Sequence, residues 1–249
     1  MRIRIFETPS EGGLYVATLM EQTVLRLDEP VLGLATGSTV LPCYASFVQI
    51  SMYGLDMSQT STLNLDEYVG LDSEHPHSYR YFMEENLFRR LPIRPKESYI
   101  PSGTADNLDE ECRRYEDIIS KNPIDLQILG IGVNGHIGFN EPNQSLLSTT
   151  HVVDLTEDTI NNNEKFFRDT DNMPKRAITM GVQAILRSKQ IVLMAFGESK
   201  KRAVVNSIEG TIRTEVPASI LQLHNDVIWV LDKESASLLD LQMIKGVNV

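Results

Sequence analysis

The chain has 249 residues, 41% of them hydrophobic, and a formal net charge of -11 at pH 7. This length and composition suffice to build one large α/β core, so we expect a single domain over 1–249. The acidic balance argues against a nucleic-acid partner, whose phosphates the protein would repel. Two cysteines do not suggest a disulfide framework. The first residues lack the apolar region of a secretory signal, and no apolar run approaches the roughly 20 residues that cross a bilayer. We therefore expect a soluble, cytoplasmic protein with no membrane partner.

Five short apolar runs predict strands in chain order, at 31–35, 63–65, 124–129, 191–196 and 227–231. Longer stretches with helical spacing lie between or beside them, at 11–27, 40–52, 78–89, 108–120 and 199–208. This alternation predicts an α/β fold with a mostly parallel sheet covered by helices. No repeat or linker marks a domain boundary. Only the polar segment 156–174 departs in composition, and we expect it to be a mobile cover.

Polar clusters follow four of the predicted strands. They are Thr36-Gly37-Ser38-Thr39, Asp66-Glu67-Tyr68, the loop 130–142 and Gly197-Glu198-Ser199-Lys200. In open α/β sheets ligands bind beyond the carboxyl ends of the strands, where loops and helix N-termini converge. The four clusters therefore predict one shared pocket.

The loop 130–142 reads G-I-G-V-N-G-H-I-G-F-N-E-P and carries the strongest signal. Histidine titrates near neutrality, at about pH 6.5, and Glu141 could fix the tautomer of His136 and support its charged form. Glycines at this density allow close backbone approach. We interpret the loop as an acid/base site; a structural histidine is the alternative. The five histidines show no tight ligand spacing with cysteines or acids, so we expect no metal site.

The other three clusters each allow two interpretations. The segment 36–39 could cradle a phosphate, although it is not a Walker A motif, or Ser38 or Thr39 could simply cap a helix. Lys200 could bind an anion beside a helix N-terminus or lie on the surface. Asp66 could remove a proton from carbon if partly desolvated, whereas Asp66 or Glu67 could instead cap the next element.

Together these motifs resemble the glucosamine-6-phosphate deaminase family. The likeness rests on LATGST at 34–39, NLDEY at 64–68, the segment 132–142 and GESK at 197–200, and extends to 75–79, 177–181 and 221–224. It implies a single Rossmann-like α/β unit with helices on both faces, and no cofactor. The implied reaction converts glucosamine 6-phosphate and water into fructose 6-phosphate and ammonia by aldose-ketose isomerisation with deamination.

The resemblance also implies the roles of individual residues. His136 would open the pyranose ring, oriented by Glu141 and Asn134, and Asp66 would move the C2 proton to C1. The substrate's phosphate would be held by Thr36, Gly37, Ser38, Thr39 and Lys200, with a further contact from Lys165. The region around 151–180 would form the active-site lid.

Three departures from the family pattern modify these expectations. Asn134 stands where many members have aspartate, so support of the His136 charge should fall more heavily on Glu141. Lys165 replaces an arginine and loses its bidentate fork. The basic residues of the allosteric members are missing at 151–154, so we expect no such activation, and a monomer or small homo-oligomer.

Three rival functions remain open at this level. An enzyme acting on galactosamine 6-phosphate would differ only at C4 of its substrate, which these motifs do not contact. A 6-phosphogluconolactonase would share the fold and a sugar-phosphate ligand, but the motifs around Asp66 and Glu141 favour the deaminase. A non-catalytic sugar-phosphate sensor would not need the acid/base residues.

Overall fold

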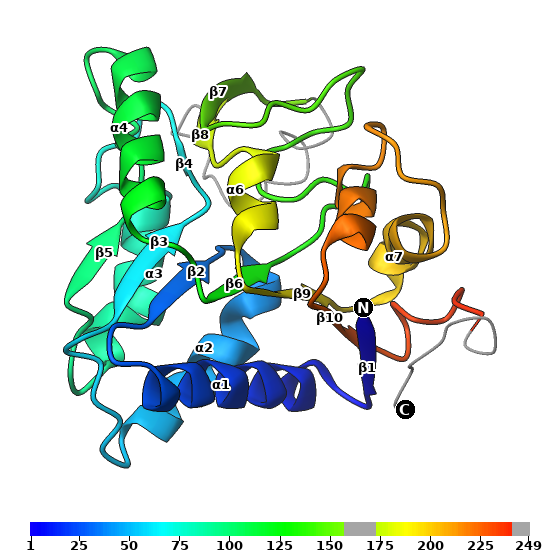
Figure 1. The fold of residues 1–249 in the computed structure, drawn as a ribbon, viewed down its shortest axis with the longest axis horizontal. Coiled ribbons are helices and arrows are strands. Elements are labelled where there is room, and N and C mark those ends of the chain that lie inside the picture. Colours follow the sequence, from blue (N-terminus) through cyan, green and yellow to red (C-terminus); the bar gives the residue numbers. More distant parts are fainter. Residues whose placement is uncertain (157–172, 241–249) are drawn as a thin grey trace.

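A seven-stranded sheet forms the centre of the molecule (Figure 1). The computed structural model describes residues 1–156 and 173–240. All neighbouring strands of this sheet pair in parallel, in the order β1 (Arg2–Phe6), β10 (Val227–Asp232), β9 (Gln190–Ala195), β6 (Leu126–Leu129), β2 (Val31–Leu34), β3 (Ser61–Asn64) and β5 (Glu97–Tyr99). The predicted α/β class and parallel sheet are confirmed.

The strand order reverses direction between β2 and β6. From β2 the chain moves outward through β3 to β5, and it then returns to the other side of β2 as β6, β9 and β10. The loops that leave β2 and β6 therefore diverge and leave a crevice at their carboxyl ends. This is the position at which doubly wound sheets bind ligands.

Six α-helices cover the sheet in the described residues: α1 (Pro9–Arg26), α2 (Leu41–Ser51), α3 (Tyr79–Asn86), α4 (Leu108–Lys121), α6 (Val182–Arg187) and α7 (Lys201–Ile208). Helices α1 and α2 pack together on one side, and α4 and α6 lie on the other (Figure 1). Short 3-10 helices complete the set, at η1 (Ser38–Val40), η2 (Phe88–Arg90), η3 (Glu198–Lys200) and η4 (Pro217–Leu223). None of the helices in the described ranges is long and apolar enough to span a bilayer.

A second, antiparallel sheet was not predicted. It consists of β4 (Asp66–Tyr68), β8 (Arg176–Thr179) and β7 (His151–Asp154), in that order. Asp66, expected in a loop after a strand, therefore begins a strand itself. The ends of the expected lid region, 151–180, form β7 and β8, and 157–172 lie outside the described residues.

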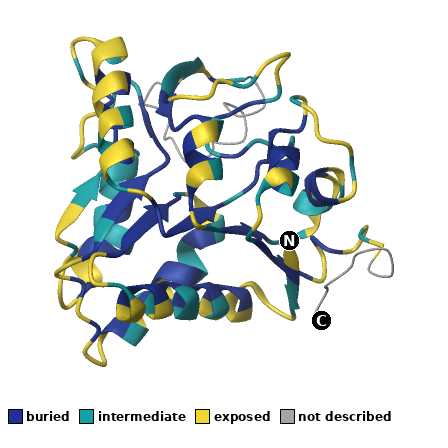
Figure 2. Cartoon of the chain, viewed as in Figure 1, coloured by how far each residue is buried: buried dark blue, intermediate teal, exposed yellow. Residues whose placement is uncertain are grey.

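The sequence specifies the helix ends and the core locally. At the start of α1, Thr8 and Glu11 form a capping box, with Pro9 in the first turn. Strands β2, β6 and β10 are buried along their whole length, as continuous apolar runs predict for a sheet covered on both faces (Figure 2). The rigid sheet thus fixes the positions from which the polar loops start.

Candidate active site

One cavity of about 490 Å³ opens at the carboxyl ends of β2, β3, β6 and β9. All four predicted polar clusters contribute to its wall, through residues 36–39, Asp66, several residues of 130–139, and Ser199 with Lys200. The prediction of a shared pocket is therefore confirmed. The aromatic side chains Tyr79, Phe139 and Phe196 complete the lining. These three were not predicted as site residues, because an aromatic residue near a strand end is more often part of the core.

Two loops of the pocket have nearly the same backbone conformation. Gly37 has φ 98° and ψ 172°, and Gly197 has φ 86° and ψ 156°. Each glycine precedes a single 3-10 turn, which leads directly into α2 or α7. A positive φ at these positions favours glycine, because a Cβ atom would be strained there.

The two loops differ in what bonds their backbone N–H groups. No side chain caps η1 or α2, so the alternative in which Ser38 or Thr39 acts as an ordinary N-cap is not observed in the described structure. In the second loop, the carboxylates of Asp232 and Glu234 accept the N–H groups of Gly197 and Glu198, at 2.8 and 3.2 Å. Helix N-termini carry partial positive charge and attract anions. The arrangement suits an anionic group such as phosphate.

Lys200 lies in the wall of the cavity, at the end of η3. Its Nζ donates a hydrogen bond to the carbonyl oxygen of Ile131, at 2.8 Å. This contact joins the GESK loop after β9 to the start of the histidine loop after β6. The interpretation of Lys200 as a plain surface residue is therefore wrong, and its ammonium group adds positive charge to the same pocket.

Asp66 faces the pocket from the first position of β4 and is only 6% exposed. Burial, and secondarily the charge of Glu67, raises the pKa of Asp66 to about 8. A carboxylate in water is a weak base, with a pKa near 3.9 for aspartate. Desolvation makes Asp66 a much stronger proton acceptor, which suits removal of a proton from carbon.

Glu67 points to a different partner, the N-terminus of α3. Its carboxylate accepts hydrogen bonds from the backbone N–H groups of Tyr68, Tyr79 and Arg80, at 2.8 to 2.9 Å. Burial raises the pKa of Glu67, and these hydrogen bonds oppose the rise. The capping alternative is thus correct for Glu67, whereas Asp66 faces the cavity.

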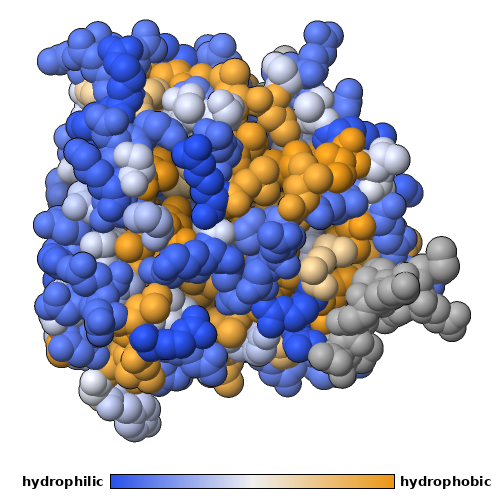
Figure 3. Space-filling model, in the orientation of Figure 1, coloured by the Kyte–Doolittle hydropathy of each residue, from blue (hydrophilic) through white to orange (hydrophobic). Residues whose placement is uncertain are grey.

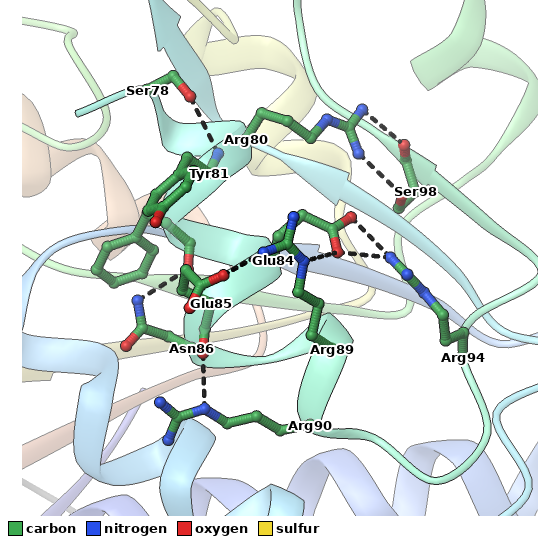
Figure 4. A network of polar contacts seen from close by, with 11 residues as sticks. Ser78, Arg80, Tyr81, Glu84, Glu85, Asn86, Arg89, Arg90, Arg94 and Ser98 are labelled. Atoms are coloured by element: carbon green, nitrogen blue, oxygen red, sulfur yellow. Dashed lines mark hydrogen bonds and ion pairs between the residues drawn. The ribbon is translucent and has the colours of Figure 1, made fainter. Parts of the chain in front are cut away.

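Polar contacts further along α3 hold the same helix against β5 and η2 (Figure 4). The Arg80 guanidinium donates to the hydroxyl and the carbonyl of Ser98, and Glu84 pairs with Arg94 at 2.7 Å. These contacts fix α3 at several points along its length. Its first residue, Tyr79, therefore enters the pocket from a rigid support and lines the cavity together with Thr36.

His136 and Glu141 interact across the histidine loop. His136 Nδ1 lies 3.2 Å from Glu141 Oε2, and the Asn134 amide donates to the same oxygen at 2.8 Å. The backbone N–H of His136 donates to Asn134 Oδ1, at 3.1 Å. An ionised carboxylate only accepts, so Nδ1 carries a proton and Nε2 is left to act on a ligand.

Burial differs between the two members of this pair. The side chain of Glu141 is 5% exposed and that of His136 is 22% exposed. Glu141 does not belong to the cavity wall, whereas Asn134 and His136 do. Glu141 therefore acts on a ligand only through His136.

Two predictions about the site need separate mention. Lys165 lies outside the described residues, so its phosphate contact stays a prediction. In the parts of the chain that are described, no group of three histidine, cysteine or acidic side chains could hold a metal ion.

Comparison with known proteins gives a consistent result. A family model described as glucosamine-6-phosphate isomerases/6-phosphogluconolactonase matches residues 10–229. A glucosamine-6-phosphate deaminase of Thermoanaerobacter sp. (strain X514) is 46% identical over 251 residues, covering 100% of this chain and 99% of the relative.

Solved structures extend this likeness to three dimensions. A monomeric glucosamine-6-phosphate deaminase superimposes with a TM-score of 0.92 at 43% identity, over 96% of this chain and 100% of that one. A 6-phosphogluconolactonase of Trypanosoma brucei has a TM-score of 0.74 at 18% identity, over 96% and 98% of the two chains, and so shares the fold alone. The chain belongs to the glucosamine-6-phosphate isomerase/6-phosphogluconolactonase family.

Proposed function

We propose that this chain is a glucosamine-6-phosphate deaminase, which converts glucosamine 6-phosphate and water into fructose 6-phosphate and ammonia. The observation that carries the proposal is the convergence of a buried carboxylate, a histidine paired with a carboxylate, Lys200 and the uncapped start of η1 and α2 on one cavity. Relatives and a solved structure at 43% to 46% identity bear this name. The lactonase compared above is only 18% identical.

The phosphate end of the substrate would bind between the paired loops. Thr36, Gly37, Ser38 and Thr39 supply N–H groups and hydroxyls, and Lys200 supplies a charge. The reacting carbons lie at the other end of the sugar. Anchoring the remote phosphate orients these carbons before reaction, which contributes to the rate in its own right.

His136 would then open the pyranose ring. Its Nε2 takes the proton of the C1 hydroxyl and gives it to the ring oxygen, so the C1–O5 bond breaks and an aldehyde forms. Glu141 holds the imidazole in the required tautomer, and Asn134 orients Glu141. The aldehyde is needed because it makes the C2 proton acidic.

Asp66 would carry the proton from C2 to C1. Removal of the C2 proton gives an enolamine, and its return to C1 gives a C2 iminium. Water adds to C2, and ammonia leaves as the C2 carbonyl of fructose 6-phosphate forms. Each step is redox-neutral, so we propose that no cofactor takes part.

Ammonia release from glucosamine 6-phosphate by the purified protein tests the proposal directly, with galactosamine 6-phosphate as the C4-epimeric control. Asp66→Asn should abolish exchange of the C2 proton with deuterated water, followed by NMR, and leave inhibition by inorganic phosphate within about twofold. Retained exchange in this variant would refute the role of Asp66. Absence of ammonia from both sugars would refute the deaminase.

We further propose a cytoplasmic enzyme that works as a monomer. Cys43 and Cys112 are both free and buried, which fits a reducing compartment. The solved deaminase at 43% identity is described as monomeric.

A further inference from the structure

The two proposed reactive groups belong to different parts of the fold. Asp66 lies on β4 of the small antiparallel sheet, whereas His136 lies in the loop that follows β6 of the large parallel sheet. A reaction that uses both on one substrate requires a fixed distance between the two elements. The contacts between the small sheet and the histidine loop are therefore of functional interest.

Thr179 lies where these two elements meet. It is the last residue of β8, is fully buried and pairs directly with Asp66 across the antiparallel ladder. Residues paired in this way project to the same face of a sheet, with Cβ atoms about 4.5 to 5.5 Å apart. The Thr179 hydroxyl oxygen accepts the backbone N–H of Phe139, at 3.1 Å.

Gly138 brings the histidine loop against both side chains. Its φ is +57°, and a Cβ atom built on it would lie 3.0 Å from Thr179 Oγ1 and 3.4 Å from Asp66 Oδ2. A side chain at position 138 would therefore touch both the Thr179 hydroxyl and the Asp66 carboxyl. The Thr179 hydroxyl bonds the next amide along the backbone of the loop.

Asn140 makes a second connection between the histidine loop and the end of β8. Its amide group donates to the carbonyl of Met180, at 2.9 Å, and the N–H of Met180 donates to the carbonyl of Leu65, at 2.7 Å. Residues 179 and 180 therefore bond the histidine loop on one side and lie against residues 65 and 66 on the other. Backbone hydrogen bonds within either sheet do not make this connection.

We propose that Thr179 is a positioning residue, whose hydroxyl sets the distance between the Asp66 carboxyl and the histidine loop. The proposal rests on the proposed deaminase function, in which both groups act on one bound sugar. Loss of the hydroxyl releases the Phe139 amide and lets the loop move relative to Asp66. A displacement of about 1 Å at a reactive centre can lower a rate by about 10²-fold.

Thr179→Val tests the proposal, because valine keeps the shape and removes the hydroxyl. We expect kcat for ammonia release to fall about 10-fold or more, with KM changed less than about threefold, since the phosphate loops are not touched. Thr179→Ser keeps the hydroxyl and should recover most of kcat. Thr150→Val is the matched control: Thr150 is buried and its hydroxyl bonds Glu116, at 2.8 Å, outside the pocket wall.

Loop position is measured on the same proteins without substrate. The amide exchange rate of Phe139 and the ring proton signals of His136 should change in Thr179→Val, and should stay at wild-type values in Thr150→Val. Melting temperatures of all variants show whether any loss of kcat follows loss of stability instead.

Three results would overturn the positioning role: wild-type kcat in Thr179→Val, unchanged Phe139 and His136 signals in that variant, or equal losses in the valine and serine variants. The proposed function fails separately, if the wild type releases no ammonia. In that case the loop signals still decide whether Thr179 positions the loop.

Discussion

Asp66 and Glu67 show how two adjacent carboxylates acquire different roles. Asp66 lines the cavity and is buried, whereas Glu67 accepts two backbone hydrogen bonds at the start of α3 and a third from its neighbour Tyr68. From the residues alone Asp66 could be a base or a cap and Glu67 a cap, and only the family resemblance favoured Asp66 as the base. Their opposite directions follow from the alternation of side chains along β4.

The pKa of Asp66 predicts the pH dependence of the reaction. A base must be ionised to accept a proton, so kcat/KM should rise with pH, reach half its maximum near pH 8 and level off about one unit above. A separate inflection near pH 6 is expected from the phosphate of the substrate. Initial rates of ammonia release across pH 5.5 to 9.5 measure this profile, and a plateau already reached at about pH 6.5 would contradict the assignment.

The same pKa predicts a cost in folding stability. An unfolded aspartate ionises near pH 3.9, whereas folded Asp66 keeps its proton to about pH 8. Its contribution to stability is therefore complete below about pH 4 and is lost as pH rises to about 8. Asp66→Asn should be more stable than the wild type by roughly 1 to 3 kcal/mol at pH 8 and equal to it near pH 4.

Thermal unfolding at several pH values measures this difference. Asp56→Asn is an informative control, because a hydrogen bond from Ser58 lowers the pKa of the exposed Asp56 carboxyl. Its replacement should lose stability above about pH 4, which is the opposite sign. A stability gain from Asp66→Asn that did not grow with pH would contradict the burial argument.

The catalytic activity of His136 should depend strongly on Glu141, because the other polar neighbour of the histidine, Asn134, carries no charge. Glu141→Gln keeps a hydrogen-bonding side chain but loses the carboxylate, and kcat should fall by at least about 10-fold. Adding Asn134→Asp to this variant should restore part of kcat, since a carboxylate returns beside the loop.

Glu116→Gln serves as control for this series. Glu116 accepts two hydrogen bonds from Thr150, outside the cavity wall, so its replacement should leave kcat near the wild-type value. Equal kcat for Glu141→Gln and the wild type would show that His136 acts without its partner.

At the scale of elements, the loops could be predicted from the sequence and the small sheet could not. Glycine and hydroxyl residues after an apolar run are local signals, and His136 and Glu141 lie five residues apart. The bond from Phe139 to Thr179 joins residues 40 positions apart, and the pairing of Asp66 with Thr179 joins strands that are more than 100 residues apart. The strands of the small sheet each contain a charged residue and at most two consecutive apolar residues, so no apolar run marks them.

The paired phosphate loops predict an effect of alanine at Gly37. Left-handed backbone strains alanine by roughly 1 to 2 kcal/mol, so Gly37→Ala should distort the N–H groups of η1 and raise KM by about 10-fold. Gly54→Ala is the matched control. Gly54 has φ +96°, and a Cβ atom added at Gly37 or at Gly54 would have no other atom within 4 Å. Unlike Gly37, Gly54 is outside the cavity wall.

Kinetic measurements on Gly37→Ala and Gly54→Ala separate a loss of phosphate binding from the effect of backbone strain. Their melting temperatures should fall by similar amounts, while only Gly37→Ala should raise KM and weaken inhibition by inorganic phosphate. A normal KM in Gly37→Ala would mean that the loop at 36–39 does not hold the phosphate.

For the whole molecule, the parallel sheet and its ligand edge could be predicted, because buried strands and intervening helices repeat along the chain. The edge strand β1 was missed, since Arg2 and Arg4 interrupt its apolar pattern.

On the face shown in Figure 3, hydrophilic residues occupy most of the surface and hydrophobic ones gather towards the upper middle.

The net charge of -11 opposes close approach of two copies, so we expect a monomer near 28 kDa. Sedimentation velocity at micromolar concentration measures this mass, at low salt and again at about 0.5 M salt, where charge repulsion is screened. A dimer under both conditions would contradict the expectation.

The hydrogen bond from Lys200 to Ile131 has a consequence for the thermodynamics of ligand binding. A free lysine side chain loses up to about 2 kcal/mol of rotamer entropy when it is ordered. In this protein the ammonium group is already directed by a carbonyl of the adjoining loop. Much of that entropy is therefore lost when the chain folds, and less is lost when an anion arrives.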